Sequence, residues 1–338
     1  MRRFNKFVVS AKIDYPLINP VPETETRPLF SVMITTYNGA ALMERTLQSV
    51  LADDLGPELM QIEVVDDYST KDDPEEVVKR VGKGRVSFYR QQKNVGISRN
   101  YTTCINRAKG HYVQILNGDD MVLPGFYATY QQFITDHPDV VMVFNRAIGI
   151  DENDNWITIL HSVPNQEFTG IVQNPALEIF RDNFVVTSSN LVLRRAYEQV
   201  GGFSPYLSHA ADWEMWMRIT ACGPVGFIHH PFFLYRFNTQ GSTSTLMAST
   251  QNIEDALQAL KMGVLRLPAN LRKQAEILGL HSCACVARNC GRHLHTINNH
   301  FAGLRNTFLA LQLHPSLLNL FFVIRSTLYC LKLKSLFS

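Results

Sequence analysis

The sequence predicts an α/β protein with a doubly wound, mostly parallel sheet, helices on both faces, and a small helical domain at the C-terminal end. Three observations support this fold class. β-rich runs alternate with helical patterns between Phe30 and Phe144, which is typical of βαβ units. The first run, Phe30–Thr36, is continuously β-rich, as expected for a strand buried on both faces. From about Met247 onward, the pattern is helical throughout.

Length and composition agree with this prediction. A chain of 338 residues has room for about two domains and a sizeable core. With 46% hydrophobic and 18% charged residues, a disordered or fibrous chain is excluded. The net charge of +2 and the evenly spread aromatic residues give no indication of nucleic-acid binding. We therefore expect small-molecule chemistry and no nucleic-acid partner.

The elements follow in order. Residues 1–28 are expected to form an irregular arm, because four prolines between positions 16 and 28 prevent a long helix. A main domain over residues 29–246 then carries strands at 30–36, 62–65, 86–89, 112–116 and 140–144. Helices are expected between them at 41–51, 74–81, 98–108 and 125–137, with Ser98 as an N-cap. After residue 144 the pattern weakens to short strands at 156–160 and 190–193 and a helix at 213–220.

The C-terminal domain, residues 247–338, is predicted to contain helices at 253–264, 271–289, 300–313 and 317–331, separated by Pro268 and Pro315. Cys283, Cys285 and Cys290 lie in this helical pattern near His293 and His295 (SCACVARNCGRHLH). Their C-x-C-x₄-C spacing does not match a zinc site, so buried packing is favoured over metal binding.

Polar side chains follow three of the predicted strands. Thr35 and Tyr37 follow the first, Asp66-Asp67 the second, and Asn117 and Asp119-Asp120 the fourth. The carboxyl ends of parallel strands meet at one edge of a sheet, where ligands bind. Taken singly, the aspartate pairs could be ordinary turn and cap residues. Taken together, they predict a site.

The sequence lacks both a G-x-G-x-x-G dinucleotide motif after a strand and a P-loop. A phosphate group here is therefore expected to be held through a divalent cation and one or two carboxylates, the usual arrangement for magnesium. Asp119 and Asp120 lie in a short loop after a strand and are the expected metal ligands.

An ordered set of motifs points to a family. The segments TTYNG, VVDDYST, NVGISRN and GHYVQILNGDDMVLPGFY resemble the nucleotide-binding half of family 2 glycosyltransferases, which have the GT-A fold. The likeness continues through SSNLVLRRAYEQVGGFSPYLSHAADWEMWMRI and LYRFNTQGSTS, and spans about residues 29–245. It implies inverting transfer of a sugar from a nucleoside-diphosphate sugar, most commonly UDP-linked, to a hydroxyl of a saccharide or lipid-linked acceptor. It also implies Mn²⁺ or Mg²⁺ as cofactor and a role in surface polysaccharide synthesis.

The resemblance assigns the nucleotide side of the site. It implies that Thr35, Tyr37 and Asp67, with Asp66 beside it, hold the base and ribose. It places Arg99 near the nucleotide and its phosphates.

The resemblance also assigns the reacting side. Asp119 and Asp120 match the metal-binding acidic motif, and Asp212 matches the catalytic base. Two positions depart from the common pattern: Asn117 replaces the first aspartate of the acidic motif, and Ala211 replaces a glutamate. A sugar hydroxyl needs a general base on the face opposite the leaving group, and a single carboxylate in that role implies direct displacement. Asp212 could instead simply cap the following helix.

Two other functions compete with this interpretation. A nucleotidyltransferase uses the same cation chemistry, but TTYNGAALMER lacks the glycine-rich, basic loop that this class favours. Asn117 and Ala211 favour a non-catalytic glycan- or nucleotide-binding module, whereas Asp119, Asp120 and Asp212 argue against it. Acceptor selection is expected in the loops at about 148–183 and 203–209.

Several conspicuous residues are expected to be structural. Trp213 and Trp216 are predicted to be core residues, His229-His230 a loop, and Arg194-Arg195 a solvated surface pair.

The C-terminal stretch combines apolar and basic residues, namely Phe321, Phe322, Ile324, Leu328 and Leu331 with Arg325, Lys332 and Lys334. It is predicted either to pack on the catalytic domain or to make peripheral contact with a membrane. Asn319 and Arg325 interrupt the nearest approach to a spanning helix. The N-terminal segment has no apolar signal-peptide core. We therefore expect a cytoplasmic protein, with contact at the inner face of the membrane as an extension of that expectation.

Overall fold

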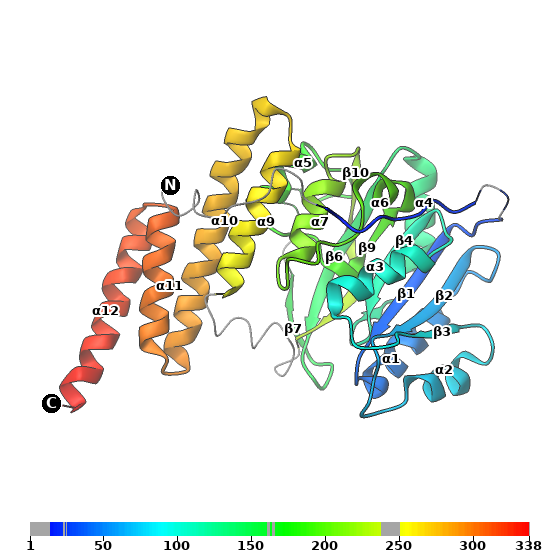
Figure 1. Ribbon diagram of the computed structural model, residues 1–338, viewed down its shortest axis with the longest axis horizontal. Helices are drawn as coiled ribbons and strands as arrows, with labels where there is room; N and C mark the ends of the chain where they lie inside the picture. The colour runs from blue at the N-terminus through cyan, green and yellow to red at the C-terminus, as the bar shows by residue number, and fades with distance from the viewer. Residues whose placement is uncertain are drawn as a thin grey trace.

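The computed structural model describes residues 14–22, 24, 26–160, 163, 166–237 and 251–337. In this part of the chain, ten strands form one sheet covered by helices on both faces, and a layer of long helices stands at one side (Figure 1). The predicted α/β class with a helical C-terminal region is confirmed.

The described strands are β1 (Phe30–Thr36), β2 (Met60–Asp66), β3 (Ser87–Arg90), β4 (Tyr112–Asn117), β5 (Met121–Val122), β6 (Met142–Ile150), β7 (Trp156–Ile159), β8 (Gly170–Ile171), β9 (Asn190–Leu193) and β10 (Val225–Arg236). Their main order is β3-β2-β1-β4-β9-β6-β10-β5, with β7 beside β6 and β8 beside β10. Neighbours β3-β2-β1-β4 and β6-β10 pair in parallel. The short β9 runs antiparallel between β4 and β6.

The strand order reverses direction between β1 and β4. From β1 the chain builds outward through β2 and β3, and then returns to place β4 on the other side of β1. Thr35 of β1 lies opposite Asn117 of β4 in the register. In open α/β sheets, the crevice outside such a pair of strand ends is where ligands bind. The fold therefore directs attention to the loops that follow Thr35 and Asn117.

The helices that surround the sheet are α1 (Ala40–Ala52), α2 (Pro74–Gly82), α3 (Ile97–Arg107), α4 (Phe126–Asp136), α5 (Pro175–Arg181), α6 (Arg194–Val200) and α7 (Ala211–Ile219). Two apolar cores result, one on each face of the sheet. One packs α1, α2 and α4 against the sheet. The other packs α3, α5, α6 and α7 and continues into the C-terminal helices. This is the doubly wound arrangement that the strand–helix alternation predicts.

Local signals explain where helices α2 and α3 begin. Asp73 caps α2 by accepting the Glu75 amide, and Pro74 occupies the first turn, where its missing N–H costs nothing. Helix α3 begins one residue earlier than predicted. Its N-cap is Gly96, with φ of 82°, a left-handed conformation that glycine adopts without strain. The prediction that Ser98 caps α3 is wrong: its hydroxyl bonds the carbonyl of Leu207.

The C-terminal helices are α9 (Gln251–Arg266), α10 (Ala269–Thr296), α11 (His300–Leu313) and α12 (Leu317–Phe337). Helix α9 packs against α7, and α10 packs against α5, which joins this layer to the sheet domain. Helices α10, α11 and α12 lie side by side, with α12 outermost (Figure 1). Helix α12 thus packs mainly on α11 rather than on the sheet domain. Cys283 and Cys290 are buried in α10, as the packing interpretation predicts.

Several other expectations can be compared with the structure. Trp213 and Trp216 are buried core residues, as predicted. The expected loop at His229-His230 is wrong, because both residues lie in β10. The surface interpretation of Arg194 is also wrong. Arg194 is 1% exposed, and its guanidinium donates to the carbonyls of Ala108 and Asn19.

Parts of three expectations lie outside the described residues: the first half of the N-terminal arm, the end of the LYRFNTQGSTS motif, and the start of the C-terminal domain at Met247. The described part of the arm is irregular, as predicted, but it is not loose. Ile18 is buried, and the Tyr15 hydroxyl donates to Glu214 of α7 at 2.5 Å. Within the described residues, no helix is both long and apolar enough to cross a membrane.

Candidate active site

The loop after β2 is held together by its two aspartates. The Asp66 carboxylate is fully buried and accepts from the Ser69 amide, the Ser69 hydroxyl at 2.6 Å and the Arg90 guanidinium at 2.6 Å. The Asp67 carboxylate accepts the amides of Val95 and Gly96 at 2.8 and 2.9 Å, which fixes the loop that opens α3. Burial raises the pKa of Asp67, and these two amides oppose the rise. Asp66 and Asp67 therefore fix the loop after β2 and the loop that opens α3, both at the carboxyl edge of the sheet.

The two central strand ends are joined through Asn117. Its side-chain oxygen accepts from the Tyr101 hydroxyl at 2.6 Å and lies 3.5 Å from the Thr35 hydroxyl. Gly118, the next residue, lies directly against β1, because a Cβ at this position would stand 2.6 Å from the Thr35 carbonyl oxygen. A glycine is required here, and the loop is drawn into the crevice between β1 and β4.

Asp119 and Asp120 lie in the loop that follows β4, hereafter the acidic loop, and they differ in their surroundings. Asp120 is buried, and its carboxylate accepts from the Ser188 hydroxyl at 2.7 Å and the Arg236 amide at 3.0 Å. Asp119 is half-buried, and no described side chain or amide from another residue donates a hydrogen bond to its carboxylate. Burial raises the pKa of both groups, and the nearby charge of Asp119 adds to the rise at Asp120. Of the two, Asp119 has the carboxylate oxygens available to a ligand.

Arg236, at the end of β10, braces this loop. Its side chain is nearly fully buried and donates to the carbonyls of Asp119 at 3.0 Å and Asp151 at 2.7 Å. It also pairs with Asp154 at 2.6 Å, and Asp154 in turn contacts Arg45. Arg236 thus ties the loop that carries Asp119 to the carboxyl end of β10 and to the turn that follows β6.

Asp212 lies in the first turn of α7. Its carboxylate accepts from the Trp213 amide at 2.6 Å, and at 3.4 Å from the side chains of Asn183 and Thr187. Burial raises the pKa of Asp212, and the Trp213 amide and His209 oppose the rise. A carboxylate with a raised pKa and only weak side-chain partners is suited to accept a proton.

Asp212 and the acidic loop are linked through one short turn. Thr187 and Ser188 are adjacent residues of a 3₁₀ turn, Thr187–Ser189. The Thr187 hydroxyl contacts Asp212, and the Ser188 hydroxyl contacts Asp120. Tyr101 also lies near all three carboxylates. Its pKa is raised well above the ordinary value, first by burial and then by the charges of Asp212, Asp120 and Asp119. The structure therefore brings the three aspartates into one neighbourhood.

Tyr37 and Arg99 lie at the rim of the site. Tyr37 follows β1 and is 51% exposed. Arg99 is exposed in the first turn of α3, and its guanidinium has no partner among the described residues. Both side chains are available to a ligand that covers the edge.

Comparisons with known proteins decide the family. A family model described as "Glycosyl transferase family 2" matches residues 31–201, about half of the sequence. The chain belongs to this family.

An uncharacterized glycosyltransferase of Rickettsia typhi is 25% identical to this family 2 chain over 253 residues, 74% of this chain and 75% of that protein. The chondroitin synthase of Escherichia coli is 22% identical over 258 residues, 76% of this chain and 35% of that protein.

Solved structures agree on the fold. Staphylococcus aureus TarS (residues 1–349), in complex with UDP-GlcNAc, aligns with a TM-score of 0.60 and 16% identity, and the alignment covers 88% of this chain and 79% of that one. The mannosyltransferase PcManGT of Pyrobaculum calidifontis, in complex with GDP-Man and Mn²⁺, gives 0.57 and 16%, covering 98% and 86%. At this identity, the likeness establishes a shared GT-A-type fold.

The donor atoms of the acidic loop suit a hard divalent cation. Mg²⁺ prefers oxygen ligands and is commonly held by one or two carboxylates together with substrate phosphates. Asp119 offers carboxylate oxygens that no described side chain occupies, in surroundings where burial makes a lone negative charge costly. Among the described residues, no group of three or more His, Cys, Asp or Glu side chains gathers to hold a metal ion. This set is consistent with a cation shared between Asp119 and a bound diphosphate.

Sequence reasoning missed several residues of the site in this family 2 glycosyltransferase. Thr187 and Ser188 link the acids, Tyr101 and Tyr235 stand between them, and Arg236 braces the loop. Arg236 is the last residue of β10, which runs parallel to β6, so the strand-end argument would have found it. The sequence analysis does not predict β10. Ser188 and Tyr235 lie inside the motifs SSNLVLRR and LYRFNTQGSTS, which did not single them out, and Thr187 and Tyr101 have no local signal in the sequence.

Proposed function

We propose that the chain transfers a sugar from a UDP-sugar to a hydroxyl of a saccharide or lipid-linked acceptor, with inversion at the anomeric carbon. The observation that carries this proposal is the tie between Asp212 and the acidic loop through the adjacent Thr187 and Ser188. A proton acceptor and a diphosphate-binding group in one neighbourhood are what glycosyl transfer needs. Family membership supports the same reaction.

On the donor side, Thr35 and Asn117 lie opposite each other at the ends of β1 and β4, and with the exposed Tyr37 they would hold the base and ribose. Arg99, exposed in the first turn of α3, would contact the nucleotide phosphates, since a guanidinium is well suited to phosphate oxygens. Asp66 and Asp67 would act by holding the loops on which the nucleotide rests. The UDP-GlcNAc complex of TarS supports a uridine base, whereas PcManGT holds GDP-Man.

Asp119 would hold the divalent cation, Mn²⁺ or Mg²⁺, with Asp120 as its buried neighbour. When bound, such a cation stabilises the charge of the departing diphosphate as a Lewis acid. The hydrogen bonds from Ser188 and Arg236 to Asp120 keep the loop in place for this role.

Asp212 would act as the general base. Its carboxylate takes the proton of the acceptor hydroxyl while the hydroxyl oxygen bonds to the anomeric carbon. The bond from that carbon to the diphosphate breaks, and the nucleoside diphosphate leaves with the electron pair. A single carboxylate on the attacking side gives one displacement and therefore inversion. Positioned acid–base groups of this kind contribute about 10²–10⁴ in rate.

The cellular role that we propose is surface polysaccharide synthesis. The likeness to chondroitin synthase supports polysaccharide synthesis. A lipid-linked acceptor would place the protein at the inner, cytoplasmic face of a membrane, with peripheral contact through α12. The exposed apolar side chains of α12 support that contact.

The first experiment is a binding screen of nucleotide sugars by thermal shift and titration calorimetry, with and without Mn²⁺. It compares the wild type with Asp119→Ala, and with Glu58→Ala as a control that removes an exposed carboxylate elsewhere. We expect one donor to stabilise the wild type and the control in a metal-dependent way, and not Asp119→Ala. Direct Mn²⁺ binding, followed by electron paramagnetic resonance, should weaken in Asp119→Ala alone.

Three outcomes would contradict the proposal. Donor binding without turnover on any acceptor hydroxyl would favour a binding module. Release of pyrophosphate from a nucleoside triphosphate would favour a nucleotidyltransferase. A product whose anomeric configuration matches that of the donor, as seen by NMR, would exclude a single displacement with Asp212 as base.

A further inference from the structure

A groove opens between side chains of α10 and α12. In Figure 1 these helices stand on the side of the molecule away from β1 and β2. Both helices pack against α11 and only sparsely against each other. The groove has a volume of about 550 Å³. Its lining side chains are Asn289, Arg292, His293, His295, Thr296, Phe322, Arg325, Ser326 and Tyr329. None of these residues belongs to the site described above.

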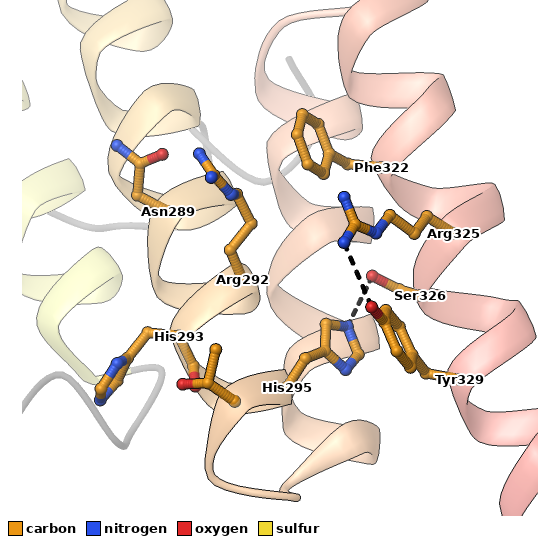
Figure 2. Close-up of a pocket in the computed structure, with 9 residues that line it drawn as sticks. Asn289, Arg292, His293, His295, Phe322, Arg325, Ser326 and Tyr329 are labelled. Carbon is orange, nitrogen blue, oxygen red and sulfur yellow. Dashed lines mark hydrogen bonds between the residues drawn. The ribbon is translucent and has the colours of Figure 1, made fainter.

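Two arginines define the charge of the groove. Arg292 comes from α10 and Arg325 from α12, and Figure 2 shows them on opposite sides of the same opening. No carboxylate pairs with either one among the described residues. The sequence explains why: from Ile277 to Ser338 it contains six lysines and arginines and no aspartate or glutamate. The segment therefore carries positive charge without a carboxylate of its own.

Neighbouring side chains hold both guanidinium groups in place. Arg325 donates to the Tyr329 hydroxyl at 3.2 Å, and the Arg292 guanidinium lies 5.6 Å from the centre of the Phe322 ring. His295 lines the same groove, and its Nε2 lies 2.7 Å from the Ser326 hydroxyl. Burial, and then the charges of His300 and Arg325, lower the pKa of His295. At neutral pH the imidazole is therefore neutral, and the arginines supply the charge.

Arginine forks combined with hydroxyl and imidazole groups favour a phosphate. Arginine binds phosphate oxygens through paired N–H donors, and the groove offers one such fork from each wall. Asn289 and Thr296 add further polar groups at the opening. The ligand class indicated by this chemistry is a phosphate ester or diphosphate.

The surface next to the groove is apolar. On α12, Phe321, Ile324 and Leu328 are each more than half exposed. They directly precede the groove residues Phe322, Arg325 and Tyr329, so the apolar face lies about 100° around the helix from the basic one. The apolar face extends to Leu317, Leu318 and Leu331, and α11 adds the exposed Phe301 and Phe308. A ligand that covers both faces has a phosphate and an apolar tail.

The charge of the groove distinguishes between two candidate occupants, a lipid and a second copy of the chain. A symmetric dimer through this face would place the same patch against itself, so that arginines would meet arginines with no carboxylate to pair with. An anionic lipid supplies both the phosphate and the apolar contact. We propose that the groove between α10 and α12 binds the phosphate of an anionic membrane lipid while the apolar face of α12 rests in the lipid layer. This binding does not depend on the transferase reaction.

The test is co-sedimentation of the full chain with vesicles of phosphatidylcholine, with and without phosphatidylglycerol. We expect strong binding only to the anionic vesicles, and a loss in Arg292→Gln/Arg325→Gln of about fivefold per arginine. The matched control is Lys273→Gln/Arg305→Gln, which removes the same charge from exposed positions outside the groove and should bind nearly as the wild type does. Phe321→Gln/Ile324→Gln should weaken binding, whereas Ile277→Gln, which removes an exposed apolar residue from α10, should not.

Each other outcome overturns the proposal. Equal losses in the groove variant and its charge-matched control would show a general electrostatic effect without a site. Protection of the groove by soluble pyrophosphate, without vesicle binding, would show a soluble anion as the ligand. Sedimentation equilibrium showing a dimer that Phe321→Gln/Ile324→Gln dissociates would show a second copy as the occupant. Donor binding, measured in parallel, should be the same in all variants, which separates this test from that of the transferase function.

Discussion

At the residue scale, Asp212 shows how surroundings select a chemical role. It stands in the first turn of a helix, where a carboxylate ordinarily serves as a cap. Here its side-chain partners, Asn183 and Thr187, lie at 3.4 Å, at the far limit of hydrogen bonding. Asp66, by contrast, has an arginine and a hydroxyl at 2.6 Å. Burial raises the pKa of the Asp212 carboxyl, and its distant side-chain partners leave an oxygen free to take up a proton.

Asp212→Asn should lower kcat by about 10²–10⁴, because the amide cannot accept the acceptor proton. The KM for the donor should change little, since the donor groups lie on β1, β4 and α3. Steady-state kinetics on a soluble acceptor measures both constants. A kcat within tenfold of the wild type would remove Asp212 from the role of base.

The raised pKa of Asp212 gives a pH prediction. Activity needs the ionised carboxylate, so kcat should fall as pH drops through the raised pKa, above the ordinary aspartate value of about 3.9. The contribution of this carboxyl to folding stability changes with pH in the opposite direction to its contribution to kcat. The stability linked to the protonated carboxyl is fully present below the ordinary pKa and is lost as pH rises through the raised one.

Asp212→Asn should therefore be at least as stable as the wild type at neutral pH, and the difference should shrink in acid. Urea unfolding at neutral pH and at a pH below the ordinary aspartate pKa measures the difference in the free energy of unfolding. A variant less stable than the wild type at neutral pH would show that the carboxylate is a structural cap.

At the element scale, helix α9 positions the start of α7. Asp255 of α9 accepts three successive amides, those of Ser208, His209 and Ala210, at 3.1, 2.6 and 2.7 Å. These residues lead directly into the turn that carries Asp212. A side chain from the C-terminal helices thus fixes the backbone that leads to Asp212.

Asp255→Ala should lower kcat about tenfold to a hundredfold with little change in donor KM, because small misplacements of a catalytic group are costly. Asp255→Asn, which keeps one oxygen acceptor, should recover part of the loss. The neighbouring Glu254→Ala removes an exposed carboxylate from the same helix and should be neutral. If kcat is unchanged in Asp255→Ala, the capped turn does not position the base.

At the scale of the whole molecule, the helical layer and the catalytic part share one core. The apolar cluster that contains Trp216 and Met217 of α7 also contains Leu257 of α9 and Cys283 of α10. The packing is close: a Cβ on Gly263 of α9 would lie 2.3 Å from the Met217 sulfur. We infer that the two parts fold together.

A chain ended after residue 246 should therefore lose its cooperative thermal transition and its donor binding, because α7 loses its apolar cover. A chain ended after Leu313 keeps α9 to α11 and should retain both, since α12 packs mainly on α11. Near-ultraviolet circular dichroism and thermal melting distinguish the two. A well-folded, donor-binding chain ending at residue 246 would show that the C-terminal helices are a separable domain.

The sequence predicts those features that are written in short, continuous segments. Periodicity gives β1, β2 and β4 and the helices between them, because a buried parallel strand and an amphipathic helix each impose a pattern within a few residues. Position after a strand gives Thr35, Asp67 and Asp119, because strand ends share an edge. The periodicity argument fails at β10, where the polar pair His229-His230 interrupts the apolar run. It also fails at Arg194, whose burial depends on carbonyls 86 and 175 residues away along the chain.

The sequence by itself determined the fold class, the family motifs and the edge at which the polar residues gather. Only the tertiary structure decided that Asp119 is open while Asp120 is bound by Ser188 and the Arg236 amide, and that Asp255 of the C-terminal helices holds the backbone that leads to Asp212. The reason is physical. A strand or helix is specified by neighbours within a few positions, whereas the availability of a carboxylate depends on which distant donors the folded chain brings to it.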